Sequence, residues 1–227
     1  MIEIQNTTKS SDGIISRYIN RKISLRITNF LLYIYPDISP LAITISCFIV
    51  ALLGGMFFIF ALPLIGGIVI QFSSIIDGCD GEIARIKNKS SKFGGFLDSI
   101  FDRYADGLIL LAIIYYLQVH WSFPGLLVPM YLLGAIAILG SLLISYTATK
   151  STQILPLEFS RTIEGRDFRY FVLMIGSIFA YFWYFALFIA VIYIACITHI
   201  KVVQRIIQLK KKLDEKRDIS DETQPAP

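Results

Sequence analysis

Four aspartates between residues 77 and 102 carry the clearest chemical signal in this sequence. Asp77 and Asp80 are three residues apart. Asp98 and Asp102 are four residues apart, so on helices each pair projects from one face, about one turn apart. Both pairs lie in apolar surroundings, where an ionisable side chain is costly and is by default a functional candidate. Carboxylates are the ligands that Mg²⁺ and Mn²⁺ prefer, and two such ions about 3.5–4 Å apart can clamp a reacting phosphoryl group.

Glycines near the aspartates leave room for a ligand between the two expected helices. A glycine has no side chain, so two helix backbones can approach each other there, or a ligand can lie against one of them. The glycines in question are Gly78, Gly81, Gly94 and Gly95. Arg85 can add a fixed positive charge beside a phosphate or a neighbouring carboxylate. The space between the helices therefore suits a phosphate with its metal ions.

The spacing of these residues matches a known signature. The pattern D-x2-D-G-x2-A-R-x8-G-x3-D-x3-D is met in full by Asp77, Asp80, Gly81, Ala84, Arg85, Gly94, Asp98 and Asp102. The chain thereby resembles the CDP-alcohol phosphotransferases, also called CDP-alcohol phosphatidyltransferases. These integral membrane enzymes transfer a substituted phosphoryl group from a CDP-alcohol to an acceptor hydroxyl, with release of CMP. The resemblance implies a six-helix membrane fold, dependence on Mg²⁺ or Mn²⁺ and a homodimer.

The resemblance also suggests roles for the signature residues. Asp77, Asp80 and Asp98 are the expected metal ligands, with Asp102 at the edge of the metal site. Asp102 matches the carboxylate that serves as general base for the acceptor hydroxyl, a role that requires hydrogen-bond reach to that hydroxyl. The residues expected at the nucleotide are Asp77, Gly81, Ala84, Arg85 and Gly94.

A second resemblance concerns the substrates. Gln71–Arg85, together with five polar residues before the first apolar run, is similar to the di-myo-inositol-phosphate-phosphate synthase branch of the family. The five residues are Ser16, Arg17, Asn20, Arg21 and Ser24. That branch joins CDP-inositol to inositol phosphate, which implies a soluble CDP-polyol donor and a phosphorylated polyol acceptor.

Two alternative functions also fit these residues, whereas a non-catalytic lipid-binding membrane protein fits less well because no signature carboxylate is missing. A phospholipid headgroup synthase would use a lipid-linked donor such as CDP-diacylglycerol or CDP-archaeol, because a cavity between the two helices should also open toward the bilayer. A divalent-cation transporter would likewise place aspartates in facing helices. A transporter, however, has no need of Gly81, Ala84 and Arg85 at nucleotide-binding spacing.

Basic residues before the fifth apolar run are candidates for acceptor binding. They are Lys150, Arg161, Arg166 and Arg169. Positive charge is expected there for topological reasons alone, which is one interpretation of the cluster. The other is a phosphate pocket, since Arg166 and Arg169 are three residues apart at a helix start and could grip an acceptor phosphate.

Two acidic residues lie outside the signature. We interpret Glu82 as an interfacial or pairing residue rather than a metal ligand. Asp106, one turn beyond Asp102, is either a hydrogen-bond partner behind the metal site or part of an acceptor pocket. The sequence does not decide between these two roles.

The composition is typical of an integral membrane protein. The chain has 227 residues, of which 55% are apolar and only 17% are charged, and its mean hydropathy is +0.64. Six spans of about 20 residues each fit this length, and a second globular domain does not. We therefore expect an all-α membrane protein with six transmembrane helices, preceded by an amphipathic helix in the cytoplasmic interface.

Local signals place the expected helices and domain limits. Apolar runs predict spans near 40–60, 64–88, 91–119 and 126–148, with Ser39 and Pro40 starting the first and Ser90 or Ser91 capping the third. The apolar stretch 170–200 is too long for one span, and its aromatic cluster at 181–185 suits a turn between two helices. The expected divisions are a disordered tail at 1–12, a basic amphipathic helix at 13–35, the membrane domain at 36–209 and a charged disordered tail at 210–227.

The 21 lysines and arginines lie before the first apolar run, between the second and third runs, at the start of the third, between the fourth and fifth, or after the sixth. The opposite connections carry none. By the positive-inside rule, both termini and the aspartate region face the cytoplasm of a multi-pass cell-membrane protein. Because topology explains the basic segments, no nucleic-acid partner is expected.

Overall fold

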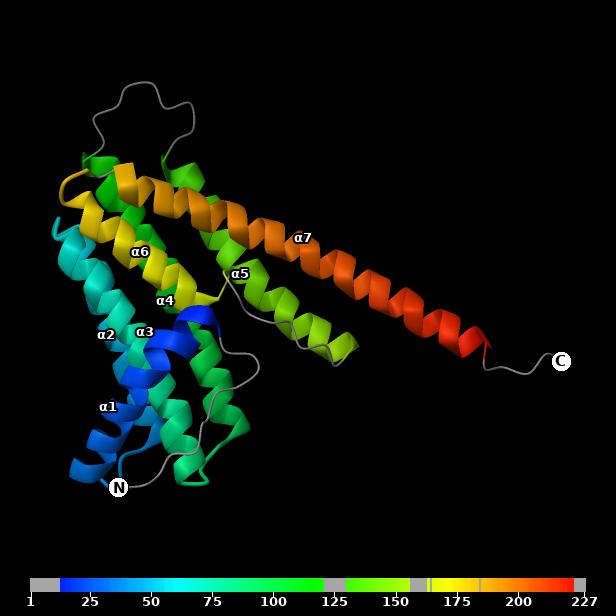
Figure 1. Ribbon diagram of the computed structural model, residues 1–227. Coiled ribbons are helices and arrows are strands. Elements are labelled where there is room, and N and C mark those ends of the chain that lie inside the picture. Colours follow the sequence, from blue (N-terminus) through cyan, green and yellow to red (C-terminus); the bar gives the residue numbers. More distant parts are fainter. Residues whose placement is uncertain (1–12, 121–129, 156–162, 164, 184, 223–227) are drawn as a thin grey trace.

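The computed structural model describes residues 13–120, 130–155, 163, 165–183 and 185–222, and all regular structure in these ranges is helical (Figure 1). The elements in chain order are a short π-helical segment η1 (Ser16–Asn20), α1 (Arg21–Ile34), α2 (Pro40–Ile59), α3 (Pro63–Ile86), α4 (Lys92–His120), α5 (Met130–Ile154), α6 (Arg166–Ala180) and α7 (Phe185–Glu222). The all-α prediction is confirmed for this part of the chain. The expected tail 1–12 lies outside the described residues.

Helix starts follow the local signals in the sequence. Ser39 is the extended N-cap residue of α2, and Pro40 occupies its first turn. The hydroxyl oxygen of Ser91 accepts a 2.9 Å hydrogen bond from the backbone N–H of Gly94, which caps α4. The connections on either side of α3 are tight, and each contains a residue with positive φ, Ala61 and Asn88. The turn before α3 lets it fold back along α2, which also packs against α4.

Within the part of the chain that the structure describes, four helices are long and apolar enough to cross a membrane: α2, α3, α5 and the segment 185–216 of α7. Helix α6 has 15 residues, and α4 carries the charged residues Asp98, Asp102, Arg103 and Asp106 in its first half. The chain is therefore a multi-pass membrane protein.

Helix α3 lies at the centre of the site-forming half of the molecule. It packs against α1, α2 and α6, while α4 packs against α2 and α5 (Figure 1). The apolar core includes Phe58 of α2, Ile70 of α3, Ile109 of α4 and Leu173 of α6, each no more than 1% exposed. This core orients the polar half of α3 toward the first half of α4.

The last helix differs from the sequence prediction. A turn at Tyr181–Phe182 separates α6 from α7, as the aromatic cluster predicted. Helix α7 then runs for 38 residues to Glu222 and projects beyond the other helices (Figure 1). The prediction of a disordered tail at 210–227 is therefore wrong for residues 210–222. Lysine and glutamate are good helix formers, and Lys211 pairs with Glu215 one turn later, at 4.0 Å.

Candidate active site

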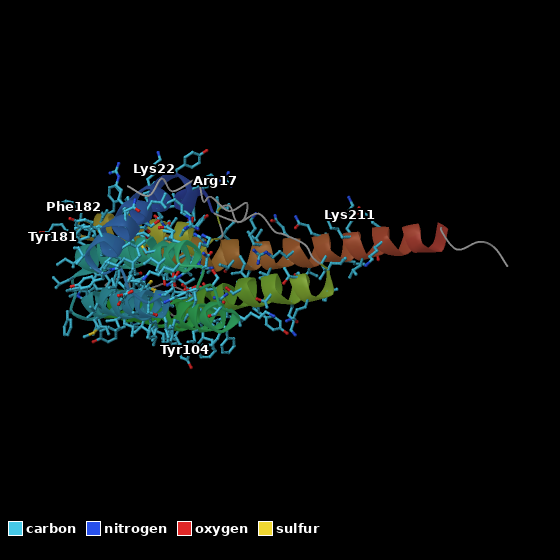
Figure 2. The ribbon with its side chains drawn as sticks, turned by 90° about the horizontal axis from the view of Figure 1, so that it is seen from below. Arg17, Lys22, Tyr104, Tyr181, Phe182 and Lys211 are labelled. Carbon is cyan, nitrogen blue, oxygen red and sulfur yellow. The ribbon has the colours of Figure 1, made fainter. Side chains whose placement is uncertain are left out.

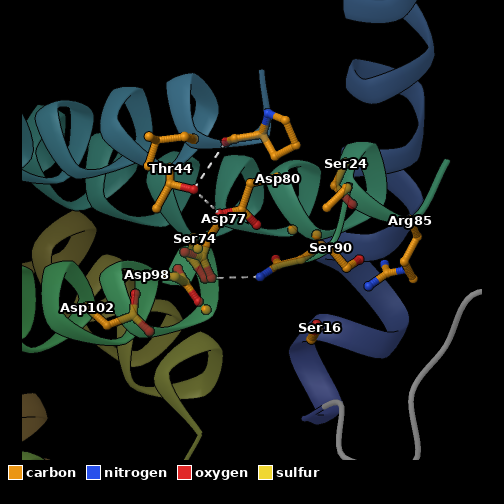
Figure 3. Close-up of a pocket in the computed structure, with 18 of the residues that line it drawn as sticks. Ser16, Ser24, Thr44, Ser74, Asp77, Asp80, Arg85, Ser90, Asp98 and Asp102 are labelled. Carbon is orange, nitrogen blue, oxygen red and sulfur yellow. Dashed lines mark hydrogen bonds between the residues drawn. The ribbon is translucent and has the colours of Figure 1, made fainter. Parts of the chain in front are cut away.

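A pocket of about 670 Å³ opens between the first helical segment, the start of α2, the second half of α3, the first half of α4 and the start of α6. Its volume is that of a typical small-molecule site. All eight signature positions line it, namely Asp77, Asp80, Gly81, Ala84, Arg85, Gly94, Asp98 and Asp102. Figure 3 shows the aspartates on neighbouring stretches of α3 and α4. The structure thus brings all eight signature residues into one cavity.

Three of the four aspartates converge. Carboxylate oxygens of Asp77, Asp98 and Asp102 all lie within 4.8 Å of one another, an arrangement that could hold a metal ion. Asp77 comes from α3, and the other two come from successive turns of α4. An all-carboxylate donor set suits a hard cation such as Mg²⁺ or Mn²⁺. The residues present therefore fit the metal that the signature implies.

Asp80 lines the same pocket but stands apart from that group of three. Its Oδ2 accepts a 2.6 Å hydrogen bond from the hydroxyl of Thr44 on α2 (Figure 3). Sequence reasoning missed Thr44, which lies in an apolar run and carries no local sign of a role. Only the packing of α2 on α3 brings the two side chains together.

Arg166, at the first position of α6, reaches into the aspartate cluster. Its Nη1 donates to Asp77 Oδ1 at 2.9 Å and also to Asp102 Oδ1. Its Nε lies 3.6 Å from Asp106 Oδ1, and its guanidinium stacks over the Tyr170 ring at 4.9 Å. The guanidinium offsets part of the negative charge of the cluster and holds α6 against both α3 and α4.

The other basic candidates lie elsewhere. Arg169 is 4% exposed and donates to Asp106, so it faces α4 rather than the pocket. Lys150 donates to Gln153 at 3.2 Å on the exposed end of α5 and is not among the described residues that line the pocket. Arg161 lies outside the described residues. Asp106 is buried between the two arginines, which fits a partner role rather than a place in the large pocket.

Arg85 lines the pocket with unsatisfied hydrogen-bond donors. Its Nε and Nη2 are buried and have no hydrogen-bond partner among the described residues. A Cβ on Gly81 would lie 3.3 Å from Arg85 Nη1, so the glycine leaves the guanidinium accessible. Leaving such donors unpaired is costly, and a bound anion would satisfy them.

The N-terminal helical segment also contributes to the pocket. Its lining residues are Gly13, Ser16, Asn20, Arg21 and Ser24. The motif that suggested the synthase branch contains the last four of these, but the sequence alone did not place them in the site. Asp167, beside Arg166, also lines the pocket and was missed.

Comparison with known proteins identifies relatives in sequence. The family model of CDP-alcohol phosphatidyltransferases matches residues 38–203. The bifunctional IPC transferase and DIPP synthase of Aquifex aeolicus is 33% identical over 208 residues, which cover 88% of this chain but only 45% of that protein. The archaetidylinositol phosphate synthase of Pyrococcus horikoshii is 30% identical over 177 residues, which cover 78% of this chain and 86% of that protein. The chain thus spans less than half the length of the Aquifex relative.

The fold also resembles a solved structure. Phosphatidylinositol phosphate synthase of Mycobacterium tuberculosis, crystallised with CDP-DAG bound, superposes with a TM-score of 0.70 at 23% identity, over 83% of this chain and 94% of that one. The same enzyme in complex with manganese and citrate gives a TM-score of 0.67 at 23% identity, over 82% of this chain and 88% of that one. At this identity the likeness concerns the fold. Because the family model covers most of the chain, this protein belongs to the CDP-alcohol phosphatidyltransferase family.

Proposed function

We propose that this chain is a metal-dependent CDP-alcohol phosphotransferase, which transfers a substituted phosphoryl group from a CDP-alcohol to an acceptor hydroxyl and releases CMP. The observation that carries the proposal is the single pocket lined by all eight signature residues. Three carboxylates converge at one side of it, and Arg85 offers it unsatisfied donors. Membership of a transferase family supports the same reaction and argues against the divalent-cation transporter.

The metal ligands in this proposal are Asp77, Asp80 and Asp98. Asp102 lies at the edge of the metal site, where its carboxylate converges with those of Asp77 and Asp98. The proposed cofactor is Mg²⁺ or Mn²⁺, as two ions, which would neutralise charge on the diphosphate and on the leaving phosphate. The manganese complex of the Mycobacterium tuberculosis enzyme supports this class of metal.

The side chains of the pocket have separate roles in proton transfer and in substrate binding. Asp102 accepts the proton of the acceptor hydroxyl. The hydroxyl oxygen bonds to the phosphorus that carries the alcohol, and the bond between that phosphorus and the CMP oxygen breaks. Arg166 orients the Asp102 carboxylate through their hydrogen bond. The nucleotide lies against Asp77, Gly81, Ala84, Arg85 and Gly94. Arg166 is the described acceptor candidate that lines the pocket, and Arg161 stays a prediction.

The proposed substrates are CDP-inositol and inositol phosphate. The relative of Aquifex aeolicus, a DIPP synthase by name, supports this choice because the match covers 88% of this chain. A phospholipid headgroup synthase with a lipid-linked donor is the second candidate. It is favoured by the archaetidylinositol phosphate synthase, which matches this chain over 86% of its own length.

We further propose that α2 to α7 all cross the membrane, with α1 in the cytoplasmic interface and the active site and both termini on the cytoplasmic side. Exposed Tyr18 and Tyr33 beside exposed Arg17 and Lys22 support an interfacial place for η1 and α1. A homodimer is proposed through α4, whose exposed apolar stripe supports it. The stripe consists of Tyr104, Leu108, Leu111, Tyr115 and Val119.

Product identification tests the function. The purified chain would be incubated with Mn²⁺, inositol phosphate and either CDP-inositol or vesicles containing CDP-diacylglycerol or CDP-archaeol, and the products identified by mass spectrometry. We expect CMP and a product that joins two inositols through phosphates when CDP-inositol is the donor. CMP release from the lipid-linked donors alone would establish the second candidate. No CMP from any donor, together with Mn²⁺ uptake into proteoliposomes, would refute the transferase.

A further inference from the structure

A row of buried polar side chains joins the N-terminal helical segment to α3. The α3 side of this polar seam consists of Gln71, Ser74, Gly78 and Glu82, at the spacing of one helix face. The opposite side consists of Asn20, Ser24 and Thr28, one turn apart along η1 and α1. All of these side chains apart from Gly78 are 8% exposed or less. The polar side of η1 and α1 therefore faces α3, while aromatic side chains on this segment are exposed.

Glu82 is the centre of the polar seam. Its carboxylate is 1% exposed and accepts three hydrogen bonds from α1. Oε1 accepts from Ser24 Oγ at 2.7 Å and from Arg21 Nη1 at 3.0 Å, and Oε2 accepts from Thr28 Oγ1 at 2.7 Å. A buried carboxylate is tolerated only with such partners, and here they all come from one helix. Glu82 thus fastens α1 to α3.

Further contacts fix the same segment at its other end. Asn20 Nδ2 donates to Ser74 Oγ at 3.2 Å, and Asp167 of α6 accepts from the backbone N–H of Ser16 at 2.6 Å. A Cβ on Gly78 would lie 3.1 Å from Ser24 Oγ, so the glycine allows α1 to lie close against α3. The segment is therefore held from α3 and from α6 together.

This fastened segment forms one side of the active-site pocket. Arg21 lines the pocket beside Ser16 and Ser24. In Figure 3, Ser16 and Ser24 lie on the side of Arg85, away from Asp98 and Asp102. The family model begins at residue 38, so η1 and α1 lie outside the part of the chain that the model covers.

We propose that η1 and α1 form a substrate-binding wall, in which Arg21 contacts a phosphate group of the substrate and Glu82 is the positioning residue that holds Arg21 there. The identity of the anion rests on the proposed function, because both the CDP-alcohol donor and a phosphorylated acceptor carry phosphate. An arginine held by a buried carboxylate presents its charge in a fixed direction, which favours recognition of phosphate oxygens. Substrate choice then depends on a segment outside the signature.

Thiol labelling tests the wall without any need for turnover. The background variant is Cys196→Ser, because Cys196 is exposed whereas Cys47 and Cys79 are buried. Ser16→Cys places a thiol in the wall, and Arg17→Cys places one on the adjacent exposed position. With Mn²⁺ present, we expect CDP or inositol phosphate to slow labelling at position 16 at least fivefold and to leave position 17 unaffected. Equal rates at position 16 with and without both ligands would overturn the wall.

Steady-state kinetics test Arg21 and separate its two possible phosphates. Arg21→Ala should raise the KM of either the donor or the acceptor at least tenfold while kcat stays within about threefold. Lys22→Ala is the matched control, since Lys22 is the neighbouring cation and is exposed. The substrate whose KM rises is the one that Arg21 contacts. Unchanged KM values for both substrates, or equal changes in the control, would refute the contact.

A double-variant comparison tests Glu82. Glu82→Gln keeps one oxygen that can accept from Ser24, and its amide N–H can donate to the Thr28 hydroxyl oxygen, but the substitution removes the charge that holds Arg21. Glu82→Gln should therefore reproduce the KM change of Arg21→Ala. The double variant should show no further change in KM, because both substitutions remove the same contact between Arg21 and the phosphate. A lower melting temperature with unchanged KM would show that Glu82 is only structural. If the wild-type chain releases no CMP from any donor, the proposed function fails. The labelling result alone then decides whether η1 and α1 form a ligand-binding wall.

Discussion

At the scale of single residues, the carboxylates of the site differ in their partners. Asp80 is held by the neutral hydroxyl of Thr44, whereas Asp77 and Asp102 share the Arg166 guanidinium. A carboxylate hydrogen-bonded to a fixed cation keeps its orientation without a hydroxyl partner. Asp102 therefore combines a fixed direction with a position at the edge of the metal site, which suits a proton acceptor.

The first prediction concerns Asp102. Asp102→Asn should lower turnover at least a hundredfold, because general-base catalysis contributes about 10²–10⁴ in rate. Calorimetry with CDP and Mn²⁺ should find affinity within about threefold of wild type, since three other aspartates remain. Asp37→Asn, on an exposed connection, is the matched control and should match wild type in both measurements. Loss of nucleotide binding as severe as in Asp80→Asn would make Asp102 an indispensable metal ligand instead.

At the scale of elements, close packing of α2 on α3 places Thr44 beside Asp80. Gly54 and Gly66 lie where the two helices meet, and a Cβ on Gly66 would be 2.7 Å from the Phe58 ring. That distance is well inside van der Waals contact, so the glycine is needed for the observed helix separation. The metal site thus depends on glycines that lie outside it.

The second prediction follows from this packing. Gly66→Ala should lower the free energy of unfolding by about 1–3 kcal/mol, the usual cost of overpacking a close contact. Gly107→Ala is the matched control, because a Cβ on Gly107 would meet nothing within 4 Å. Its stability should stay the same or rise slightly, since alanine favours helix over glycine by about 1 kcal/mol. Thermal unfolding in detergent measures both, and a Gly66→Ala variant as stable as wild type would contradict the close contact.

At the scale of the whole molecule, the two ends of α7 differ in chemistry. The turn that precedes it carries exposed Tyr181 and Phe182, while Lys211 lies far along the projecting end (Figure 2). Aromatic side chains favour the membrane interface, and lysines favour the cytoplasmic side. The helix is therefore expected to pass from the outer interface into the cytoplasm.

The third prediction tests that orientation. In the Cys196→Ser background, Phe182→Cys should react with a membrane-impermeant thiol reagent on intact cells, and Lys211→Cys should react only after permeabilisation. The two positions serve as controls for each other, because both are exposed in the structure. The reverse pattern would place the active site on the outer side and contradict the proposed topology.

The sequence by itself determined the helices and the set of signature residues. Side chains within a few residues of each boundary predict the helix starts at Pro40 and Lys92 and the turn near Tyr181. The aspartate spacing likewise fixes which carboxylates share a helix face. Such features are local, so they can be predicted from the amino-acid sequence alone.

Only the tertiary structure decided which distant side chains meet in the site. Arg166 lies against Asp77 and Asp102, and Glu82 holds Arg21, although dozens of residues separate these partners. Their contacts depend on how α6 and α1 pack against α3, and no spacing along the chain specifies that packing. The helical course of residues 210–222 escaped prediction for a related reason. A run of charged residues fits either a solvated helix or a disordered tail, and here it continues a helix that packing against α5 and α6 has already formed.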